Sequence, residues 1–183
     1  MALFPFGRTL HCTCGERVGL APRRRLAPNE APRFLADAML GRLARWLRLL
    51  GFDTEYAEHL ADGELVRRAI EEERWILTRD RRLPQEWRVS GILVLGAEDL
   101  LGQLRDVVRT LRLAGRARPF SRCGECNAPL VAARREEVAP ELPPRVLETQ
   151  REFHRCPGCG RVYWRGSHAA RMEAVIGRVL EES

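Results

Sequence analysis

Four of the six cysteines in this chain have the spacing of a metal site. They form two pairs, Cys123-Gly-Glu-Cys126 and Cys156-Pro-Gly-Cys159, and in each pair two residues separate the thiols. Two such knuckles can place four sulfurs around one zinc ion, each at about 2.3 Å. Four thiolates leave no open coordination position, so the spacing predicts a structural zinc ion, and the chemistry must lie elsewhere.

The alternative for these cysteines is two disulfides or free buried thiols. The first residues lack the layout of a signal peptide, and no apolar stretch approaches the roughly 20 residues of a membrane span. We therefore expect a soluble protein of the reducing cytoplasm, with no membrane partner. In that setting zinc is favoured over disulfides.

Three carboxylates stand where a parallel sheet would bring them to one edge. Asp37 ends the apolar run 34–36, Asp80 follows the run 75–78, and Asp62 begins a helical segment. Ligands of parallel sheets bind outside the carboxyl ends of the strands. Clustered carboxylates repel one another unless a cation joins them, and Mg²⁺ or Mn²⁺ takes oxygen ligands of this kind. The pattern predicts a catalytic divalent ion that holds a scissile phosphate and activates water.

Each carboxylate also has a simpler interpretation. Asp37 and Asp62 could cap the helices that follow them, a role in which Asp contributes about 1 kcal/mol. Asp80 could pair at the surface with a neighbouring arginine. Three further acidic residues could join the site or serve only as helix starts. They are Glu64, Glu98 and Asp99.

Arginines near these carboxylates could bind phosphate. Arg42, Arg45 and Arg48 follow Asp37 at intervals of three residues, which places them on one side of a helix. Arg79 directly precedes Asp80. These four side chains could hold the substrate near the carboxylates, or form a solvated face.

The charge of the chain is compatible with a nucleic-acid partner. Its net charge is +6, its pI is about 9.5, and all 31 of its basic residues are arginine, whose planar fork of donors suits phosphate. Residues 33–115 carry 14 basic and 14 acidic residues, so the excess lies in the two flanks. This distribution suits a neutral catalytic body held to RNA by basic ends, or a set of solvated surfaces.

Residues 1–32 show no clear periodicity. Arg23-Arg24-Arg25 together with Pro22, Pro28 and Pro32 predict a flexible basic extension. Cys12 and Cys14 could be half of a second metal knuckle, but no cysteine pair remains to complete it. Their role is left open.

From Arg33 onward, strand and helix patterns alternate. Apolar runs predict strands at 34–36, 54–57, 75–78 and 91–95. Apolar residues at helical spacing predict a first helix that begins with Met39 and stops at Gly51, and two more over 62–70 and 100–111. This alternation is typical of an α/β domain with a parallel sheet covered on both faces.

The C-terminal third has a different pattern. Pro140, Pro143 and Pro144 predict an irregular loop between the cysteine pairs. Residues 162–164 predict a strand, and residues 169–181 predict an amphipathic helix. We therefore divide the chain into an N-terminal extension (1–32), an α/β body (33–115), and a zinc ribbon with a C-terminal helix (116–183).

Four ordered stretches resemble one known family. They are Arg33-Phe-Leu-Ala-Asp-Ala-Met-Leu-Gly-Arg-Leu-Ala-Arg-Trp-Leu-Arg-Leu-Leu-Gly-Phe-Asp53, Ile76-Leu-Thr-Arg-Asp-Arg-Arg-Leu83, Ser121-Arg-Cys-Gly-Glu-Cys-Asn127 and Cys156-Pro-Gly-Cys-Gly-Arg-Val-Tyr-Trp-Arg-Gly-Ser-His168. The first two resemble the opening and the second motif of the mut-seven C-terminal ribonuclease domain family, and the last two resemble its zinc ribbon. The similarity covers about residues 33–175.

The resemblance implies a PIN-like nuclease fold, that is, a three-layer domain with a parallel sheet, and metal-dependent cleavage of RNA. The acidic positions that match the family are Asp37, Asp62 and Asp80, and Glu64 and Asp99 match less closely. Some members carry a ubiquitin-like domain before the nuclease body, where this chain has only residues 1–32.

The leading hypothesis is therefore a metal-dependent ribonuclease that hydrolyses phosphodiester bonds of single-stranded RNA. One rival is a non-catalytic zinc-ribbon protein that binds RNA or the ribosome. Another is a protein-interaction scaffold in which zinc only stabilises the fold. Metal-dependent cleavage separates the first hypothesis from the other two, and salt-sensitive RNA binding separates the second from the third.

Overall fold

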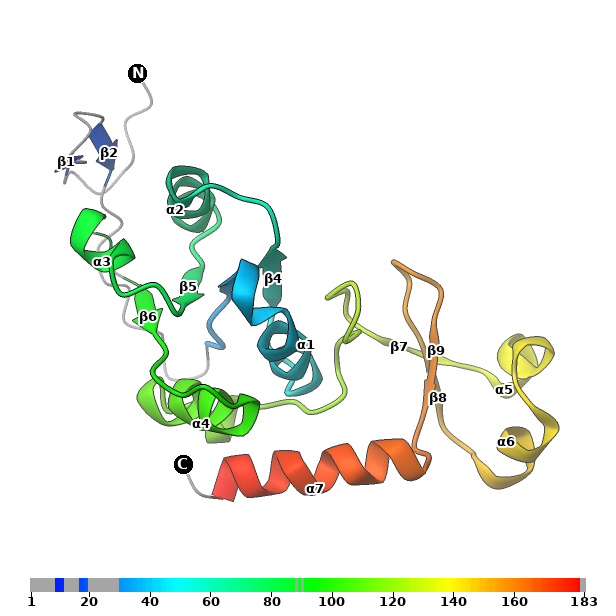
Figure 1. The fold of residues 1–183 in the computed structure, drawn as a ribbon. Coiled ribbons are helices and arrows are strands. Elements are labelled where there is room, and N and C mark those ends of the chain that lie inside the picture. The colour runs from blue at the N-terminus through cyan, green and yellow to red at the C-terminus, as the bar shows by residue number, and fades with distance from the viewer. Residues whose placement is uncertain (1–8, 12–16, 20–29, 88, 90, 182–183) are drawn as a thin grey trace.

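A computed structural model describes residues 9–11, 17–19, 30–87, 89 and 91–181. Within these residues a four-stranded parallel sheet has the order β4-β3-β5-β6 (Figure 1). The strands are β3 (Phe34–Asp37), β4 (Thr54–Ala57), β5 (Trp75–Thr78) and β6 (Ile92–Val94). The chain runs outward from β3 to β4 and then returns past β3 to β5. The connections therefore diverge between β3 and β5.

Helices cover both faces of this sheet. Successive side chains of a strand point to opposite faces, so Phe34 and Ala36 enter one core and Leu35 enters the other. The helices α1 (Gly41–Leu49), α4 (Leu100–Thr110) and α7 (Ser167–Glu181) cover the first core. The helices α2 (Asp62–Glu71) and α3 (Leu83–Glu86) cover the second. The expected α/β class and the helical cover of both sheet faces are confirmed.

The first helix begins later than the periodicity predicts. Residues Ala38–Leu40 form a 3-10 turn, η1, and Met39 is 72% exposed instead of facing the core. A 3-10 turn has three residues per turn, so it rotates Met39 away from the stripe that α1 buries. Gly51 ends the helix as expected, at a φ of 92° that favours glycine.

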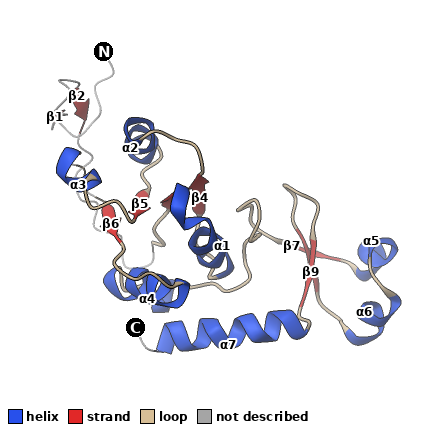
Figure 2. Ribbon diagram, viewed as in Figure 1, coloured by secondary structure: helices blue, strands red, loops and turns tan. Residues whose placement is uncertain are grey.

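The ribbon is a three-stranded antiparallel sheet of order β7-β8-β9, with β7 (Val131–Ala133), β8 (Phe153–Arg155) and β9 (Val162–Trp164) (Figure 2). The loop expected to be irregular instead contains α5 (Arg135–Val138), the 3-10 turn η3 (Ala139–Glu141) and α6 (Pro144–Thr149). That expectation was wrong because proline is compatible with the first turn of a helix, where Pro144 lies.

The C-terminal helix α7 returns from the ribbon to the α/β body. It lies along α4, and Ile176 and Val179 are buried in the core that also contains Phe34 (Figure 1). One further 3-10 turn, η2 (Ala114–Arg116), follows α4. None of the described helices is long and apolar enough to cross a membrane.

Two short strands lie within residues 1–32. Strands β1 (Thr9–His11) and β2 (Arg17–Gly19) pair antiparallel as a small hairpin, which the sequence pattern did not predict. The suggested half-knuckle at Cys12 and Cys14 lies outside the described residues.

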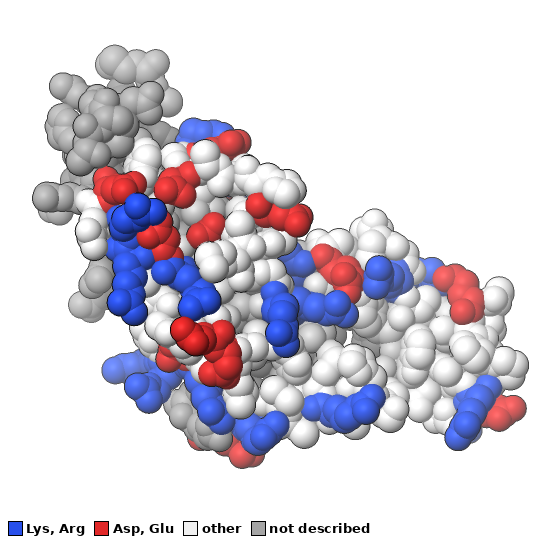
Figure 3. Space-filling view, viewed as in Figure 1, with Lys and Arg blue, Asp and Glu red and all other residues white. Residues whose placement is uncertain are grey.

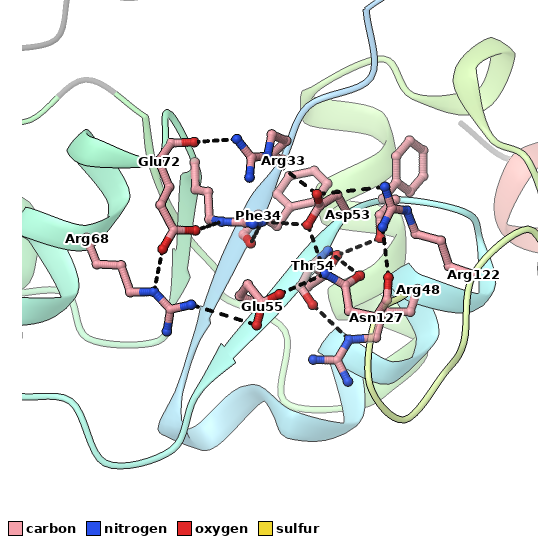
Figure 4. Close-up of polar contacts among 12 residues, drawn as sticks. Arg33, Phe34, Arg48, Asp53, Thr54, Glu55, Arg68, Glu72, Arg122 and Asn127 are labelled. Carbon is pink, nitrogen blue, oxygen red and sulfur yellow. Dashed lines mark hydrogen bonds and ion pairs between the residues drawn. The ribbon is translucent and has the colours of Figure 1, made fainter. Parts of the chain in front are cut away.

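The ribbon is joined to the α/β body by a buried arginine. Arg48 of α1 donates from Nε to the Thr54 carbonyl at 2.7 Å (Figure 4). It also donates from one terminal nitrogen to the Glu125 carbonyl at 2.6 Å. The same nitrogen lies 3.3 Å from the Gly124 carbonyl. Arg48 therefore satisfies carbonyls of the first cysteine knuckle and of β4 at once.

Asn127 forms the second half of this joint. It adopts a left-handed φ of 68°, which Asn tolerates better than most residues, and its side chain is buried. Its Oδ1 accepts from the Thr54 amide at 3.0 Å, and its Nδ2 donates to Asp53 at 2.8 Å and to Glu55 at 3.0 Å. We call the contacts of Arg48 and Asn127 across this boundary the ribbon joint.

Ion pairs extend the ribbon joint along the amino-terminal edge of the sheet. Asp53 lies 2.6 Å from buried Arg74, which also pairs with Glu72. Glu72 pairs with Arg68 at 2.7 Å, and Arg122 of the ribbon approaches Asp53 at 3.7 Å (Figure 4). This edge is therefore occupied by charges that neutralise one another.

Replacing Arg48 tests the ribbon joint. We expect Arg48→Met to lower the free energy of unfolding by about 2–4 kcal/mol, because it leaves buried carbonyls without a charged donor. Arg42→Met on the same helix is the matched control. Arg42 is exposed and has no partner among the described residues, so it should change stability by less than about 0.5 kcal/mol. Equal denaturant midpoints for the two variants would contradict the role of Arg48.

Asp53 should make the joint sensitive to acid. Burial alone raises its pKa, but hydrogen bonds from Arg74 and Asn127 and the charges of Arg74 and Arg122 outweigh burial and lower the pKa. The resulting stability is present above the unfolded pKa of about 3.9 and is lost as the pH falls through the lower folded value. The free energy of unfolding, measured from denaturant curves between about pH 2 and 6, should therefore change less with pH for Asp53→Asn than for the wild type.

Candidate metal centre and carboxylate edge

The four predicted cysteines meet in space. Their sulfur atoms all lie within 4.8 Å of one another, with 3.6 Å between Cys123 and Cys159 and 3.2 Å between Cys126 and Cys156. A tetrahedral ion with metal–sulfur distances of about 2.3 Å requires sulfur–sulfur distances of about 3.8 Å. The four thiols can therefore hold one metal ion such as zinc.

Backbone amides and a tyrosine hydroxyl surround these sulfurs. The amide of Cys126 donates to the sulfur of Cys123 at 3.5 Å, and the amide of Cys159 donates to the sulfur of Cys156 at 3.4 Å. The Tyr163 hydroxyl lies 2.9 Å from the sulfur of Cys123. Burial alone raises the pKa of Cys123, but hydrogen bonds from the Cys126 amide and the Tyr163 hydroxyl lower it to about 6. This favours the thiolate that a metal ion binds.

Asp37 and Asp80 lie on either side of one buried hydroxyl. The Thr78 hydroxyl at the end of β5 donates to Oδ2 of Asp37 at 2.7 Å, and its oxygen accepts from the Asp80 amide at 3.0 Å. The remaining oxygen of Asp37 accepts from the Ala38 amide at 2.7 Å. Thr78 thus links the ends of β3 and β5, where the connections of the sheet diverge and where such folds bind ligands.

The simpler interpretations of these residues hold as well. Asp37 caps η1 through the Ala38 amide, and Asp80 lies 3.7 Å from Arg82 in an ion pair. Asp99 caps α4, where its side chain accepts from the Gly102 amide at 2.9 Å. Glu98 is exposed beside it. A capping or pairing role does not prevent a carboxylate from binding a cation with its other lone pairs.

Asp62 is the first residue of α2 and is exposed, with no capping bond to the helix. It follows β4 and therefore belongs to the carboxyl edge of the sheet, as Asp37 and Asp80 do. Glu64, two residues further, pairs with Arg67 at 3.8 Å. Among the described residues, only the four cysteines form a group of three or more metal-ligating side chains close enough to share an ion.

The four candidate arginines lie in different surroundings. Arg42 is exposed and Arg79 is half-buried, and neither has a side-chain partner among the described residues. Arg45 pairs with Glu125 of the ribbon at 2.8 Å. Arg48 is buried in the ribbon joint, where its donors are used by carbonyls. The three-residue spacing of Arg42, Arg45 and Arg48 placed them on one side of a helix, but the ribbon covers part of that side.

Thr78 and Tyr56 were missed by sequence reasoning. The Tyr56 hydroxyl donates to the Ala38 carbonyl at 2.7 Å and so holds the turn that follows Asp37. Gly41 allows this, because a Cβ there would lie 3.0 Å from the Tyr56 ring. A threonine at the end of a buried strand, two residues before Asp80, was the available signal for Thr78.

Comparison with known proteins adds one positive finding. A family model described as the Mut7-C RNAse domain matches residues 32–176. No curated protein and no solved structure matches the chain.

Zinc content tests the cysteine centre. The purified protein should contain about one zinc ion per chain by elemental analysis, and Cys156→Ser should lose the ion and melt at a lower temperature. Tyr163→Phe removes only the hydroxyl beside Cys123. It should keep the fold and weaken zinc binding by about 10–100-fold in a competition with a chromogenic chelator. A zinc-free wild type with an unchanged melting temperature would contradict this role.

Proposed function

Because the chain belongs to the Mut7-C RNAse domain family, we propose that it is a metal-dependent ribonuclease that hydrolyses phosphodiester bonds of single-stranded RNA. We also assign its body to the PIN-like fold on the strength of this membership. The observation that carries the proposal is the Thr78 hydroxyl, which bonds to the Asp37 carboxylate and to the Asp80 backbone amide. It lies at the point where the sheet connections diverge. Carboxylates at this place are suited to phosphate chemistry through a bound cation.

The residues that would hold a divalent ion are Asp37, Asp80 and Asp62. Their oxygen atoms fit a hard cation, Mg²⁺ or Mn²⁺. The second oxygen of Asp80 accepts no hydrogen bond from the described residues, and the exposed Asp62 side chain has no partner there. When bound, the ion supplies positive charge at the scissile phosphate and lowers the pKa of water.

The other residues position the carboxylates and the substrate. The Thr78 hydroxyl orients Asp37, since it donates to a carboxylate oxygen. Tyr56 fixes the turn after Asp37. Arg42 and Arg79 are the candidates that remain free to bind phosphate groups, whereas Arg45 and Arg48 serve the contact with the ribbon.

In this proposal the ribbon zinc is structural and the chemistry belongs to the carboxylate edge. Cys123, Cys126, Cys156 and Cys159 fill all four positions of a tetrahedral ion, so no position remains for substrate. The proposed setting is the cytoplasm, where thiols stay reduced.

One observation favours the rival, a non-catalytic zinc-ribbon protein that binds RNA or the ribosome. The carboxylates of Asp37, Asp62 and Asp80 do not form a ready metal group among the described residues. In that case RNA would bind without being cut, and divalent ions would not change the melting temperature.

Amide substitutions at the edge decide between the two. With Mn²⁺ or Mg²⁺, the wild type should cleave single-stranded RNA, and Asp37→Asn or Asp80→Asn should slow cleavage by roughly 100-fold or more, because an amide carries no charge for the ion. Added Mn²⁺ should raise the melting temperature of the wild type but not of the variants.

Asp106→Asn is the matched control, since Asp106 lies on α4 and has no partner among the described residues. It should cleave at the wild-type rate. Cleavage that survives both substitutions at the edge, after contaminating nucleases are excluded, would remove this site from consideration.

A further inference from the structure

Positive charge gathers at the end of α4, away from the carboxylate edge. Residues 100–118 carry five arginines and one acidic residue, Asp106, although the whole of residues 33–115 is neutral. In Figure 3 basic groups are spread along the layer of α4 and α7. Residues 100–118 therefore carry a local excess of four positive charges (5 − 1).

Two of these arginines line a hollow. A depression of about 420 Å³ is bounded by Arg109, Arg112, Val108, Ala114 and Gly115. Both arginines are exposed, and neither side chain has a hydrogen bond or ion pair within the described chain, not even with Asp106. Their donors are available to an anionic ligand, and the guanidinium fork matches phosphate.

The backbone at Arg112 is strained. Arg112 has a φ of 52°, and the Leu113 amide bonds to the Val108 carbonyl at 2.9 Å, which closes α4 with the turn that usually places glycine at this position. The left-handed conformation is unfavourable for a residue with a Cβ, and a cation near a helix C-terminus offsets part of that cost. Arg112 also lines the hollow.

The hollow and the carboxylate edge lie at opposite ends of one helix. Asp99 caps α4 beside the carboxyl ends of the strands, and Arg109 follows it by ten residues (109 − 99). At about 1.5 Å per residue the two ends are about 15 Å apart. A strand of several nucleotides could contact both places, whereas a very short one could contact only one.

We propose that Arg109 and Arg112 form a phosphate-binding subsite for the RNA backbone, distinct from the carboxylate edge. Arg116 of η2 lies next to the hollow and adds charge to it. That the ligand is RNA rests on the proposed function. The subsite adds to that function because it makes binding depend on the length of the strand.

Binding of labelled RNA tests the subsite. Fluorescence anisotropy would be measured without added Mg²⁺ or Mn²⁺, in an Asp80→Asn background, with single-stranded RNA of about 20 and about 4 nucleotides. Each lost phosphate contact lowers the salt slope by about 0.7 on single strands, so Arg109→Gln/Arg112→Gln should lower it by about 1.4 for the long RNA. At about 0.1 M salt this corresponds to roughly 25-fold weaker binding. Without a divalent ion the carboxylate edge repels phosphate, so the short RNA can bind only at the arginines and should also lose affinity in this double variant.

Arg145→Gln/Arg151→Gln is the control with the same charge change. Both residues are exposed on the segment between β7 and β8 and have no side-chain partner in the described residues. Equal losses in both double variants, or no loss in either, would overturn the subsite. So would loss of binding to anionic phospholipid vesicles without loss of RNA binding. If the wild type binds RNA in this arginine-dependent way but never cleaves it, the subsite stands and the proposed ribonuclease activity fails.

Discussion

The hydrogen bonds of Asn127 with Asp53, Thr54 and Glu55 are the interaction on which the rest of the arrangement depends. They join the residue after the first cysteine knuckle to the start of β4, an edge strand of the parallel sheet. The side chain uses both donors and its acceptor, and none of these groups is left unsatisfied in a buried place. These contacts require the turn at Asn127, and a metal ion held by the four cysteines would stabilise that turn. Such an ion would thus help to fix a strand outside its own module.

The amino-terminal and carboxyl ends of the parallel strands differ in how their charged groups are paired. At the amino-terminal edge, Asp53, Arg74, Glu72 and Arg68 pair in a continuous row, so the charges stabilise the joint and leave little for a ligand. At the carboxyl edge, one hydroxyl serves Asp37 and the Asp80 backbone, and the nearby Arg42 and Arg79 stay unpaired. Unpaired charge that contributes nothing to stability is where function is expected.

Local patterns predicted the parts of the fold that local chemistry decides. The cysteine spacing fixed which four thiols could meet, and apolar runs found the strands of the body because parallel strands are buried on both faces. Long-range packing decided the rest. Arg48 shares its periodicity with Arg42, and only the position of the ribbon makes one buried and the other exposed. Thr78 gave little signal, because its importance comes from Asp37, which is 41 residues away in sequence.

The return of α7 to the body has a consequence for how the protein comes into being. Ile176 and Val179 complete the core beside Phe34. The last strand of the sheet ends at Val94, 82 residues before Ile176 (176 − 94). At about 5–20 residues per second, those residues take roughly 4–16 seconds to synthesise. During that time one face of the sheet lacks the part of its cover that α7 provides.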